Sequence, residues 1–332
     1  MNTKYSIIVP VYNRPDEVDE LLESLTKQTL KDFEVIIVED GSIKPCKDVC
    51  EKYANILDLH YYAKENSGPG QSRNYGAERS NGEWLIILDS DVVLPEDYLE
   101  AVEKSLASST SIVAWGGPDA AHPSFTPVQK AISYSMTSFF TTGGIRGGKA
   151  KLDKFYPRSF NMGIRRDVYL KLEGFTKMRF GEDIDFSYRI VEAGYMPRLF
   201  PEAWVWHKRR TDFRKFFRQV YNSGIARINL EKRHPGTMKL VHLLPTVFTL
   251  GVIGLLLITL IFTYACVPII LYSAIIFIDS SIKNKSLWVG LLSIPAAFVQ
   301  LMGYGFGFIE SWWKRCVLKQ DEFTAFEKNF YK

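Results

Sequence analysis

Two short acidic clusters, Asp89 with Asp91 and Glu182 with Asp183, contain the side chains best suited to chemistry. Asp89 and Asp91 directly follow five uninterrupted apolar residues, 84–88. A run of this kind is typical of a strand that is buried on both faces. Because an unpaired buried carboxylate costs several kcal/mol, the pair belongs either to a solvated turn or beside a positive charge. Two such carboxylates suit a hard divalent cation, Mg²⁺ or Mn²⁺.

The elements that must position these acids alternate between strand and helix signals over residues 1 to about 115. We expect strands in "YSIIVPVYN", "FEVIIVEDGS", "DLHYYAKE" and 84–88, and helices in "PDEVDELLESLTKQ" and "GPGQSRNYGAERS". Repeated strand–helix units predict an α/β fold with a mostly parallel sheet and right-handed crossovers. In such sheets ligands bind at the carboxyl ends of the strands. Asn13, Asp40, Asp89 and Asp91 should all lie at that edge.

The pattern weakens between residues 116 and 158 and then returns. "TTGGIRGGKA" is a glycine-rich basic loop, either a lid or a plain connector, and "SFNMGIRRDVYLKLEGF" predicts a strand followed by a helix. "RFGEDIDFSYRIVEAGY" predicts a helix that begins with Glu182, Asp183 and Asp185 and ends near Gly194. These acids could complement the positive helix N-terminus or accept a proton during catalysis.

Four motifs in this order, "SIIVPVYNR", "VEDGS", "SRNYGAERSNGEWLIILDSDV" and "GEDIDFSYRI", resemble the family 2 inverting glycosyltransferases with a GT-A fold. The resemblance covers roughly residues 4–210. It implies a Rossmann-like sheet, a nucleotide-diphospho-sugar donor and a divalent metal, Mg²⁺ or Mn²⁺.

The resemblance also implies a role for each matching residue. It assigns the nucleotide pocket to Pro10, Tyr12 and Asn13, and the base or ribose contact to Asp40. It places Arg73 and Asn74 near the nucleotide, and it makes Asp89 and Asp91 the residues that hold the metal and the diphosphate. It makes Asp183 the catalytic base, with Glu182 beside it. His207 matches a histidine that approaches the metal or the diphosphate.

Each residue taken alone has a simpler interpretation. Asp40 before Gly41 could form a turn, Arg73 could be a solvated surface charge, and His207 could be structural. The set of motifs favours the functional interpretation. Processive synthases of this family carry a Gln-x-x-Arg-Trp motif, which "FRKFFRQVYNSGIAR" lacks, so we expect transfer of a single sugar. A catalytically silent relative that acts as a partner in a membrane complex is the alternative from another class.

The C-terminal part of the chain has the composition of membrane segments. Residues 240–278 and 286–309 contain no Asp, Glu, Lys or Arg, and a helix needs about 20 apolar residues to cross a bilayer. The first run is long enough for a hairpin that turns near Pro268. Three full crossings would put Lys314, Arg315 and Lys319 outside, against the positive-inside tendency, so the topology stays open.

The sequence therefore predicts four regions: a catalytic domain over 1–210, an amphipathic interfacial helix over 211–239, two or three transmembrane segments over 240–310, and a charged tail over 311–332. The short apolar start and four cysteines fit a catalytic domain on the cytoplasmic side of a multi-pass membrane protein. A net charge of +4 does not favour nucleic acid as a partner. The membrane segments suggest a lipid-carried acceptor, and the resemblance to membrane-anchored members of the family implies that it is polyprenyl-linked and serves cell-surface glycan synthesis.

Overall fold

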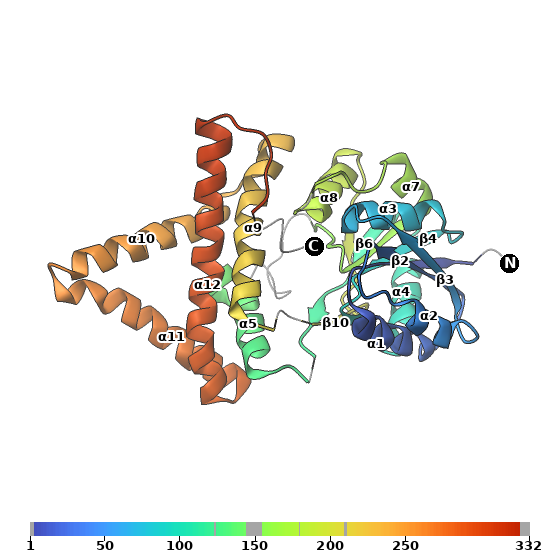
Figure 1. Ribbon diagram of the computed structural model, residues 1–332, viewed down its shortest axis with the longest axis horizontal. Helices are drawn as coiled ribbons and strands as arrows, with labels where there is room; N and C mark the ends of the chain where they lie inside the picture. Colours follow the sequence, from blue (N-terminus) through green and yellow to red (C-terminus); the bar gives the residue numbers. More distant parts are fainter. Residues whose placement is uncertain (1–2, 123, 144–154, 179, 209–210, 326–332) are drawn as a thin grey trace. The chain divides into compact units, whose positions relative to one another are not determined.

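The computed structural model describes residues 3–122, 124–143, 155–178, 180–208 and 211–325 (Figure 1). The chain forms two compact units. The first comprises residues 1–122 and 152–208, and the second comprises 123–151 and 209–332.

The first unit is built on a seven-stranded sheet in the order β3-β2-β1-β4-β8-β6-β9. The strands are β1 (Tyr5–Val11), β2 (Phe33–Asp40), β3 (Asp58–Lys64), β4 (Trp84–Leu88), β6 (Ala114–Gly116), β8 (Asn161–Arg165) and β9 (Arg198–Leu199). The helices are α1 (Pro15–Thr26), α2 (Lys47–Tyr53), α3 (Pro69–Glu78), α4 (Tyr98–Ala107), α7 (Arg166–Lys171) and α8 (Glu182–Glu192). The predicted mostly parallel α/β fold with flanking helices is confirmed.

The sheet changes direction once in a way that matters for the site. β3, β2, β1 and β4 are parallel, but β8 runs antiparallel to β4, with Asn161 opposite Leu88. The amino end of β8 therefore lies at the same edge as the carboxyl ends of the parallel strands. The loop that precedes β8 is delivered to that edge.

Both faces of the sheet are covered, because residues on β1 alternate between two apolar clusters. Ile7 and Val9 pack with Leu21 and Leu25 of α1. Ile8 points to the other face, in a cluster with α3, α7 and α8. Side chains alternate across a strand, so an entirely apolar strand such as β4 is what a sheet covered on both faces requires.

A small second sheet extends the strand-end region. It has the order β5-β10-β7, formed by β5 (Val92–Val93), β10 (Val205–His207) and β7 (Asp119–Ala120). β10 pairs antiparallel with β5, with His207 opposite Val92. This pairing carries His207 back to the residues that follow β4.

The second unit is helical. It contains α5 (Pro127–Thr137), α6 (Phe139–Thr142), α9 (Phe213–Arg233), α10 (Leu244–Thr259), α11 (Val267–Asn284) and α12 (Leu287–Trp312), with 3₁₀ turns η1 (Leu240–His242) and η2 (Thr263–Cys266) and the π-helical turn η3 (Trp313–Val317). Three stretches, 240–259, 263–284 and 287–317, are long and apolar enough to cross a membrane. The predicted C-terminal apolar helices are thus present.

Glycines allow α12 to pack closely with its neighbours. A Cβ at Gly307 would lie 2.0 Å from the backbone oxygen of Tyr221 on α9, and a Cβ at Gly290 would lie 1.9 Å from Ser281 Oγ on α11. A side chain at either position would collide with its neighbour. α12 consequently forms the centre of the unit.

The weakly patterned region does contain helix α5, which packs on α12 through Ala131 and Ala296 and so belongs to the second unit, although the predicted domain boundary put it in the catalytic domain. Most of the glycine-rich loop, residues 144–150, lies outside the described residues.

Candidate functional site

The predicted polar residues do gather at one edge of the sheet. Tyr12 and Asn13 follow β1, Asp40 ends β2, and Asp89 and Asp91 follow β4. Because β2, β1 and β4 are adjacent and parallel, their carboxyl ends meet there, as the sequence predicted.

Asp91 lies between the side chains of Arg14 and His207. Arg14 Nη1 is 3.1 Å from Asp91 Oδ2, and His207 Nε2 is 3.1 Å from Asp91 Oδ1. The backbone N–H of Lys208 donates to the Asp91 carbonyl at 3.0 Å, which fixes β10 against this turn. His207 also stacks on Phe160, with ring centroids 4.9 Å apart. The imidazole is therefore held in one orientation by packing and by the strand pairing.

These residues fit a divalent metal. One potential ligand atom from each of Asp89, Asp91 and His207 lies within 4.8 Å of the other two. Asp91 is buried, whereas Asp89 is part-exposed, so the group is accessible from one side. Two carboxylates with one imidazole form a mixed oxygen and nitrogen set that suits Mn²⁺, and Mg²⁺ through the oxygens.

A buried arginine connects this group to the acids of α8. Arg73 on α3 places Nη2 2.7 Å from Asp89 Oδ1 and Nη1 3.2 Å from Glu182 Oε1. Its guanidinium also lies over the ring of Phe175, 5.2 Å from the centroid. The interpretation of Arg73 as a solvated surface charge is wrong. Burial raises the pKa of Glu182 to about 7, and the nearby Asp183 carboxylate adds to the rise while Arg73 opposes it.

Asp183 has a different environment. Arg158 Nε lies 2.5 Å from Asp183 Oδ2, and the backbone N–H of Ile184 donates to Oδ1 at 2.9 Å. Burial acts to raise the pKa of Asp183, but the Arg158 guanidinium outweighs it, so this pKa lies below its ordinary value. Two adjacent carboxylates thus have opposite shifts, a pattern that is common where acid and base roles are separated. The next acid, Asp185, pairs with Arg189 and Thr176 instead.

Asp40 and Asn13 organise the loops at this edge. Asp40 accepts hydrogen bonds from the backbone N–H groups of Ser67 and Gly68, both at 2.9 Å, and pairs with Lys64. Asn13 adopts a left-handed backbone, with φ of 56°, and its Oδ1 accepts from the N–H groups of residues 43 and 44. Asparagine tolerates this conformation better than most residues. Both side chains therefore fix the loops that follow β1, β2 and β3.

Asn74 is occupied by contacts within the first unit. Its Oδ1 accepts from Tyr169 OH at 2.6 Å and from the Phe175 N–H at 2.8 Å, and its Nδ2 donates to the Phe175 carbonyl at 2.8 Å. This pattern fastens the loop before α8 to α3. A direct contact of Asn74 with the nucleotide stays a prediction, as do those of Pro10 and Tyr12 at the end of β1.

Sequence reasoning missed three charged residues at this edge. Arg14 pairs with Asp91, Arg158 pairs with Asp183, and Asp119 Oδ2 lies 3.9 Å from His207 Nδ1. Asp119 and Arg158 lie in the weakly patterned region, and each reaches the site through a strand pairing that the sequence does not encode locally. Arg14 was visible inside "SIIVPVYNR", but nothing there indicated its partner.

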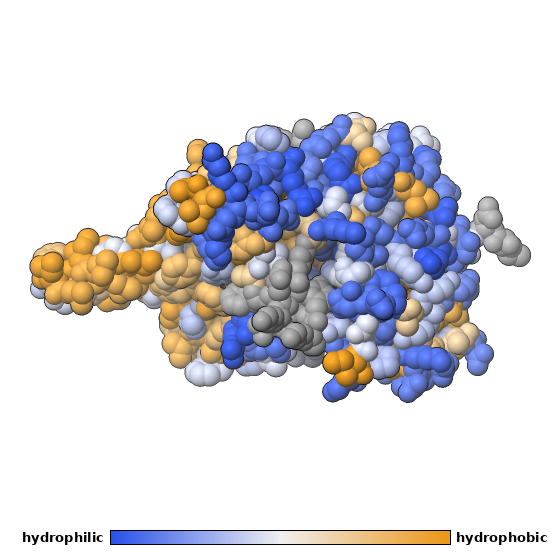
Figure 2. Space-filling view, turned by 45° about the horizontal axis from the view of Figure 1, so that its top comes forward, coloured by the Kyte–Doolittle hydropathy of each residue, from blue (hydrophilic) through white to orange (hydrophobic). Residues whose placement is uncertain are grey.

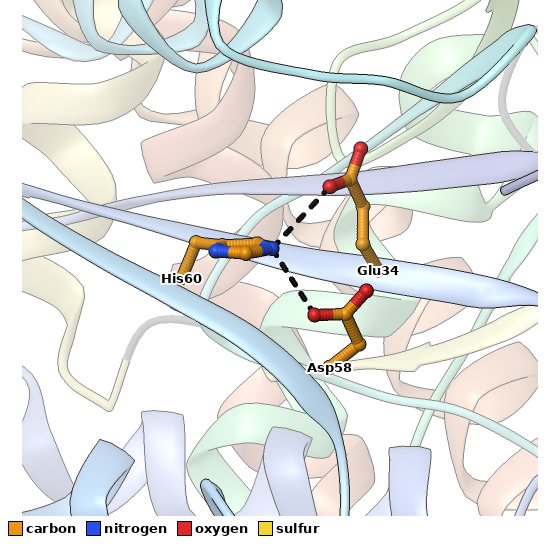
Figure 3. Close-up of side chains that lie close together, drawn as sticks. All are labelled: Glu34, Asp58 and His60. Atoms are coloured by element: carbon orange, nitrogen blue, oxygen red, sulfur yellow. Dashed lines mark ion pairs between the residues drawn. The ribbon is translucent and has the colours of Figure 1, made fainter. Parts of the chain in front are cut away.

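A second group of potential metal ligands lies at the opposite ends of the strands. His60 Nε2 is 3.1 Å from Asp58 Oδ1 and 3.5 Å from Glu34 Oε2 (Figure 3). Glu34 also accepts hydrogen bonds from Ser6 and Asn81. Both carboxylates approach the same ring nitrogen, so the three residues form a polar cluster at the start of β2 and β3.

Comparison with known proteins agrees with this geometry. The family model described as "Glycosyl transferase family 2" matches residues 6–172, slightly more than half of the chain. An uncharacterized glycosyltransferase of Haemophilus influenzae is 33% identical over 193 residues, 56% of this chain and 62% of that protein. The poly(ribitol-phosphate) beta-N-acetylglucosaminyltransferase TarS of Staphylococcus aureus is 38% identical over 101 residues, 29% of this chain and 18% of TarS. The chain spans less than two thirds of the length of these curated relatives.

Two solved structures share the fold. The crystal structure of S. aureus TarS 1–349 aligns with a TM-score of 0.50 at 22% identity, covering 68% of this chain and 64% of that one. The mannosyltransferase PcManGT from Pyrobaculum calidifontis, solved with GDP-Man and Mn²⁺, aligns with a TM-score of 0.64 at 17% identity, covering 91% of this chain and 88% of that one. On the family match and the GT-A fold together, this chain belongs to glycosyl transferase family 2.

Proposed function

We propose that this protein is an inverting glycosyltransferase that moves one sugar from a nucleotide-diphospho-sugar to a lipid-linked acceptor at the cytoplasmic face of a membrane. Residues 1–122 and 152–208 would form the catalytic unit, and the helices of the second unit would attach it to the membrane. The product would serve cell-surface glycan synthesis.

One observation carries the proposal: Arg73 contacts both Asp89 and Glu182. The arginine joins the carboxylates suited to metal and diphosphate to the pair suited to proton transfer. A turn or a helix-capping group has no need of such a connection. The solved complex of PcManGT with GDP-Man and Mn²⁺ supports the same ligand classes for this fold.

The chemistry follows from what each group can hold. Asp89, Asp91 and His207 would bind Mg²⁺ or Mn²⁺, which when bound neutralises the leaving diphosphate. An acceptor hydroxyl attacks poorly unless a carboxylate takes its proton. Asp183 is the proposed base, and Arg158 orients its carboxylate through the 2.5 Å contact. Attack opposite the diphosphate inverts the anomeric carbon in one displacement.

The membrane helices are the reason to propose a lipid-linked acceptor. A nucleotide sugar is water-soluble, so its enzyme gains nothing from membrane attachment unless the acceptor is there. A polyprenyl carrier is the class of lipid that we propose. TarS, by its name, modifies poly(ribitol-phosphate), which shows only that acceptors differ between relatives.

The test is a transfer assay with the purified full chain in detergent. A panel of UDP- and GDP-sugars is supplied with Mn²⁺ and a polyprenyl-linked acceptor extract, and labelled sugar is counted in the lipid phase. Asp183→Asn serves as the control for chemistry: turnover should fall by about two to four powers of ten, while donor affinity is kept.

Three outcomes would count against the proposal. Normal turnover in Asp183→Asn would move the base to another carboxylate, with Glu182 next. Transfer of many sugars in a row would indicate a processive synthase. Failure of the wild-type protein to bind any nucleotide sugar with Mn²⁺ would favour the catalytically silent relative.

A further inference from the structure

α12 is long enough to cross a membrane, but its packing partners are not those of a spanning helix. Its C-terminal half lies alongside α9 (Figure 1). Gly303 faces Val220, Gly307 faces the backbone of Tyr221, and Ser311 Oγ donates to the Ile225 carbonyl at 3.2 Å. The two helices therefore run side by side and in the same direction over several turns.

α9 is too charged to lie in hydrocarbon. It carries six basic residues distributed along its length: Arg214, Lys215, Arg218, Arg227, Lys232 and Arg233. A charged side chain near the bilayer centre is costly. Because α12 lies against α9, the same argument keeps the C-terminal half of α12 at the water boundary.

The N-terminal half of α12 has a polar partner as well. Val289 and Ala296 pack on Ala131 of α5, a helix that also carries Gln129, Lys130 and several hydroxyl side chains. α12 is thus flanked by α5 along its N-terminal half and by the basic helix α9 along its C-terminal half.

The opposite face of α12 holds the apolar helices. A Cβ at Gly305 would lie 2.1 Å from Thr249 Oγ1 of α10. Gly305 is two positions from both Gly303 and Gly307, which is about 200° around a helix at 3.6 residues per turn. α10 and α9 therefore contact opposite sides of α12.

Beyond this contact, α10 and α11 form an arm with an apolar surface (Figure 2). No residue from 253 to 275 is buried, and none is charged. Leu260 is 83% exposed and Ile261 is 94% exposed at its tip. Exposed apolar surface on this scale marks a lipid or protein contact.

The arm is short. At 1.5 Å per residue, α10 extends about 10 Å beyond Val252, its last buried residue, and α11 extends about 14 Å before Ile276, its first. The hydrocarbon core of a bilayer is about 30 Å thick. From a helix at the surface, the arm reaches only about halfway across.

We infer that the second unit enters one leaflet of the membrane and returns: α12 lies along the surface, the α10–α11 arm dips into the hydrocarbon, and the catalytic unit and the C-terminus stay on the same side. This inference rests on the proposed membrane attachment but not on the proposed chemistry. The partner is the lipid bilayer itself. This topology also agrees with the positive-inside tendency, which three full crossings would violate. Lys314, Arg315 and Lys319 stay on the same side of the membrane as the basic residues of α9.

C-terminal contacts agree with this topology. Arg315 Nε donates to Asn229 Oδ1 at 3.1 Å, and Arg233 pairs with Glu322 at 2.8 Å. The segment after α12 therefore stays beside the C-terminal end of α9. Since α9 follows directly from the catalytic unit in the chain, both ends of the second unit lie at the same membrane surface.

One native cysteine and two introduced cysteines test the inference in the full-length protein. Cys316 is exposed at the end of α12, and Cys46 and Cys50 are buried. Ser108→Cys adds an exposed thiol to the catalytic unit, and Ile261→Cys adds one at the tip of the arm. Sealed membrane vesicles of both orientations are treated with a membrane-impermeant maleimide, and labelled peptides are read by mass spectrometry.

We expect Cys316 and Ser108→Cys to be labelled in the same vesicle orientation. Ile261→Cys should be protected in both orientations and labelled once detergent dissolves the bilayer, which shows that its thiol is reactive. Labelling of Cys316 in the opposite orientation to Ser108→Cys would mean an odd number of crossings and overturn the inference. Labelling of Ile261→Cys from the far side would mean that the arm crosses completely, which also overturns it.

A charge at the tip gives an independent readout. Ile261→Lys should shift protein from the membrane fraction to the soluble fraction after a carbonate wash. Ile56→Lys, at a 65% exposed position in the catalytic unit, is the matched control and should not. Equal retention of the two variants would show that the arm does not hold the protein in lipid.

Discussion

Glu182 should destabilise the free protein above neutral pH, and replacing it with glutamine should remove that cost. Burial raises the pKa of Glu182 from 4.5 to about 7 in the folded state. A folded state that holds a proton more tightly than the unfolded state loses stability as pH rises through the interval between the two pKa values. For Glu182 this interval runs from 4.5 to about 7, so the cost is absent below it and complete above it.

The size of the effect follows from the shift. Each pKa unit corresponds to about 1.4 kcal/mol, so the carboxylate costs at most about 3 kcal/mol at pH 8. Glutamine matches the protonated acid in shape, and Glu182→Gln should therefore raise stability by up to this amount at pH 8 and by little at pH 4.5. In a unit of this size that corresponds to roughly 6–12 °C in melting temperature.

The assay is thermal unfolding of the full chain in detergent, with chelator present and no nucleotide, from pH 4.5 to 8. Asp183→Asn is the matched control, because Arg158 lowers the pKa of Asp183 and loss of that carboxylate should destabilise the protein at pH 8. If Glu182→Gln melts at the wild-type temperature or below at pH 8, then Arg73 keeps Glu182 fully ionised and the reasoning is refuted.

Three further predictions concern binding and packing. Asp91→Asn should abolish Mn²⁺-supported binding of a nucleoside diphosphate, measured by calorimetry; unchanged affinity would remove Asp91 from the metal site. Gly307→Leu should cost about 1–3 kcal/mol by overpacking against α9 and lower the melting temperature, whereas Gly251→Leu, with nothing within 4 Å of its Cβ position, should not. Asn74→Ala should lower stability by about 1–3 kcal/mol, because it leaves the partners of its amide unsatisfied; a weaker donor affinity at unchanged melting temperature would instead support the predicted nucleotide contact.

Much of the fold could be predicted because its signals are local. The apolar run before Asp89 has the length of a strand, and Pro15 and Pro69 stand in the first turn of their helices, where proline is favoured. Parallel order then follows from strand–helix alternation. The strand positions and their parallel order are enough to predict that Asn13, Asp40 and Asp89 meet at one edge of the sheet.

The features that could not be predicted depend on pairings between segments that are distant in the sequence. β8 shows the same apolar pattern whether it runs parallel or antiparallel to β4, so its direction, and with it the position of Arg158, could not be read from the sequence. The role of Asn74 is a second case: an amide in the middle of a helix gives no sign that Tyr169 and Phe175, about a hundred residues later, will be its hydrogen-bond partners. The amphipathic pattern of α9 predicts a helix with one apolar face, but it does not identify α12 as the helix that packs on it.

Arg14 and Arg73 each pair with one carboxylate of the proposed metal site, Asp91 and Asp89 respectively. In the protein without metal, these guanidinium groups supply the positive charge that a bound metal would otherwise supply to the same carboxylates. A cation arriving alone must compete with them, but a cation arriving with a diphosphate gives each displaced guanidinium a new anion to bind. We therefore expect metal and nucleotide to load cooperatively, and Mn²⁺ titrations with and without a nucleoside diphosphate would measure the coupling. Such an exchange of partners would keep the affinity of the carboxylates for a free cation low until the nucleotide-sugar donor binds.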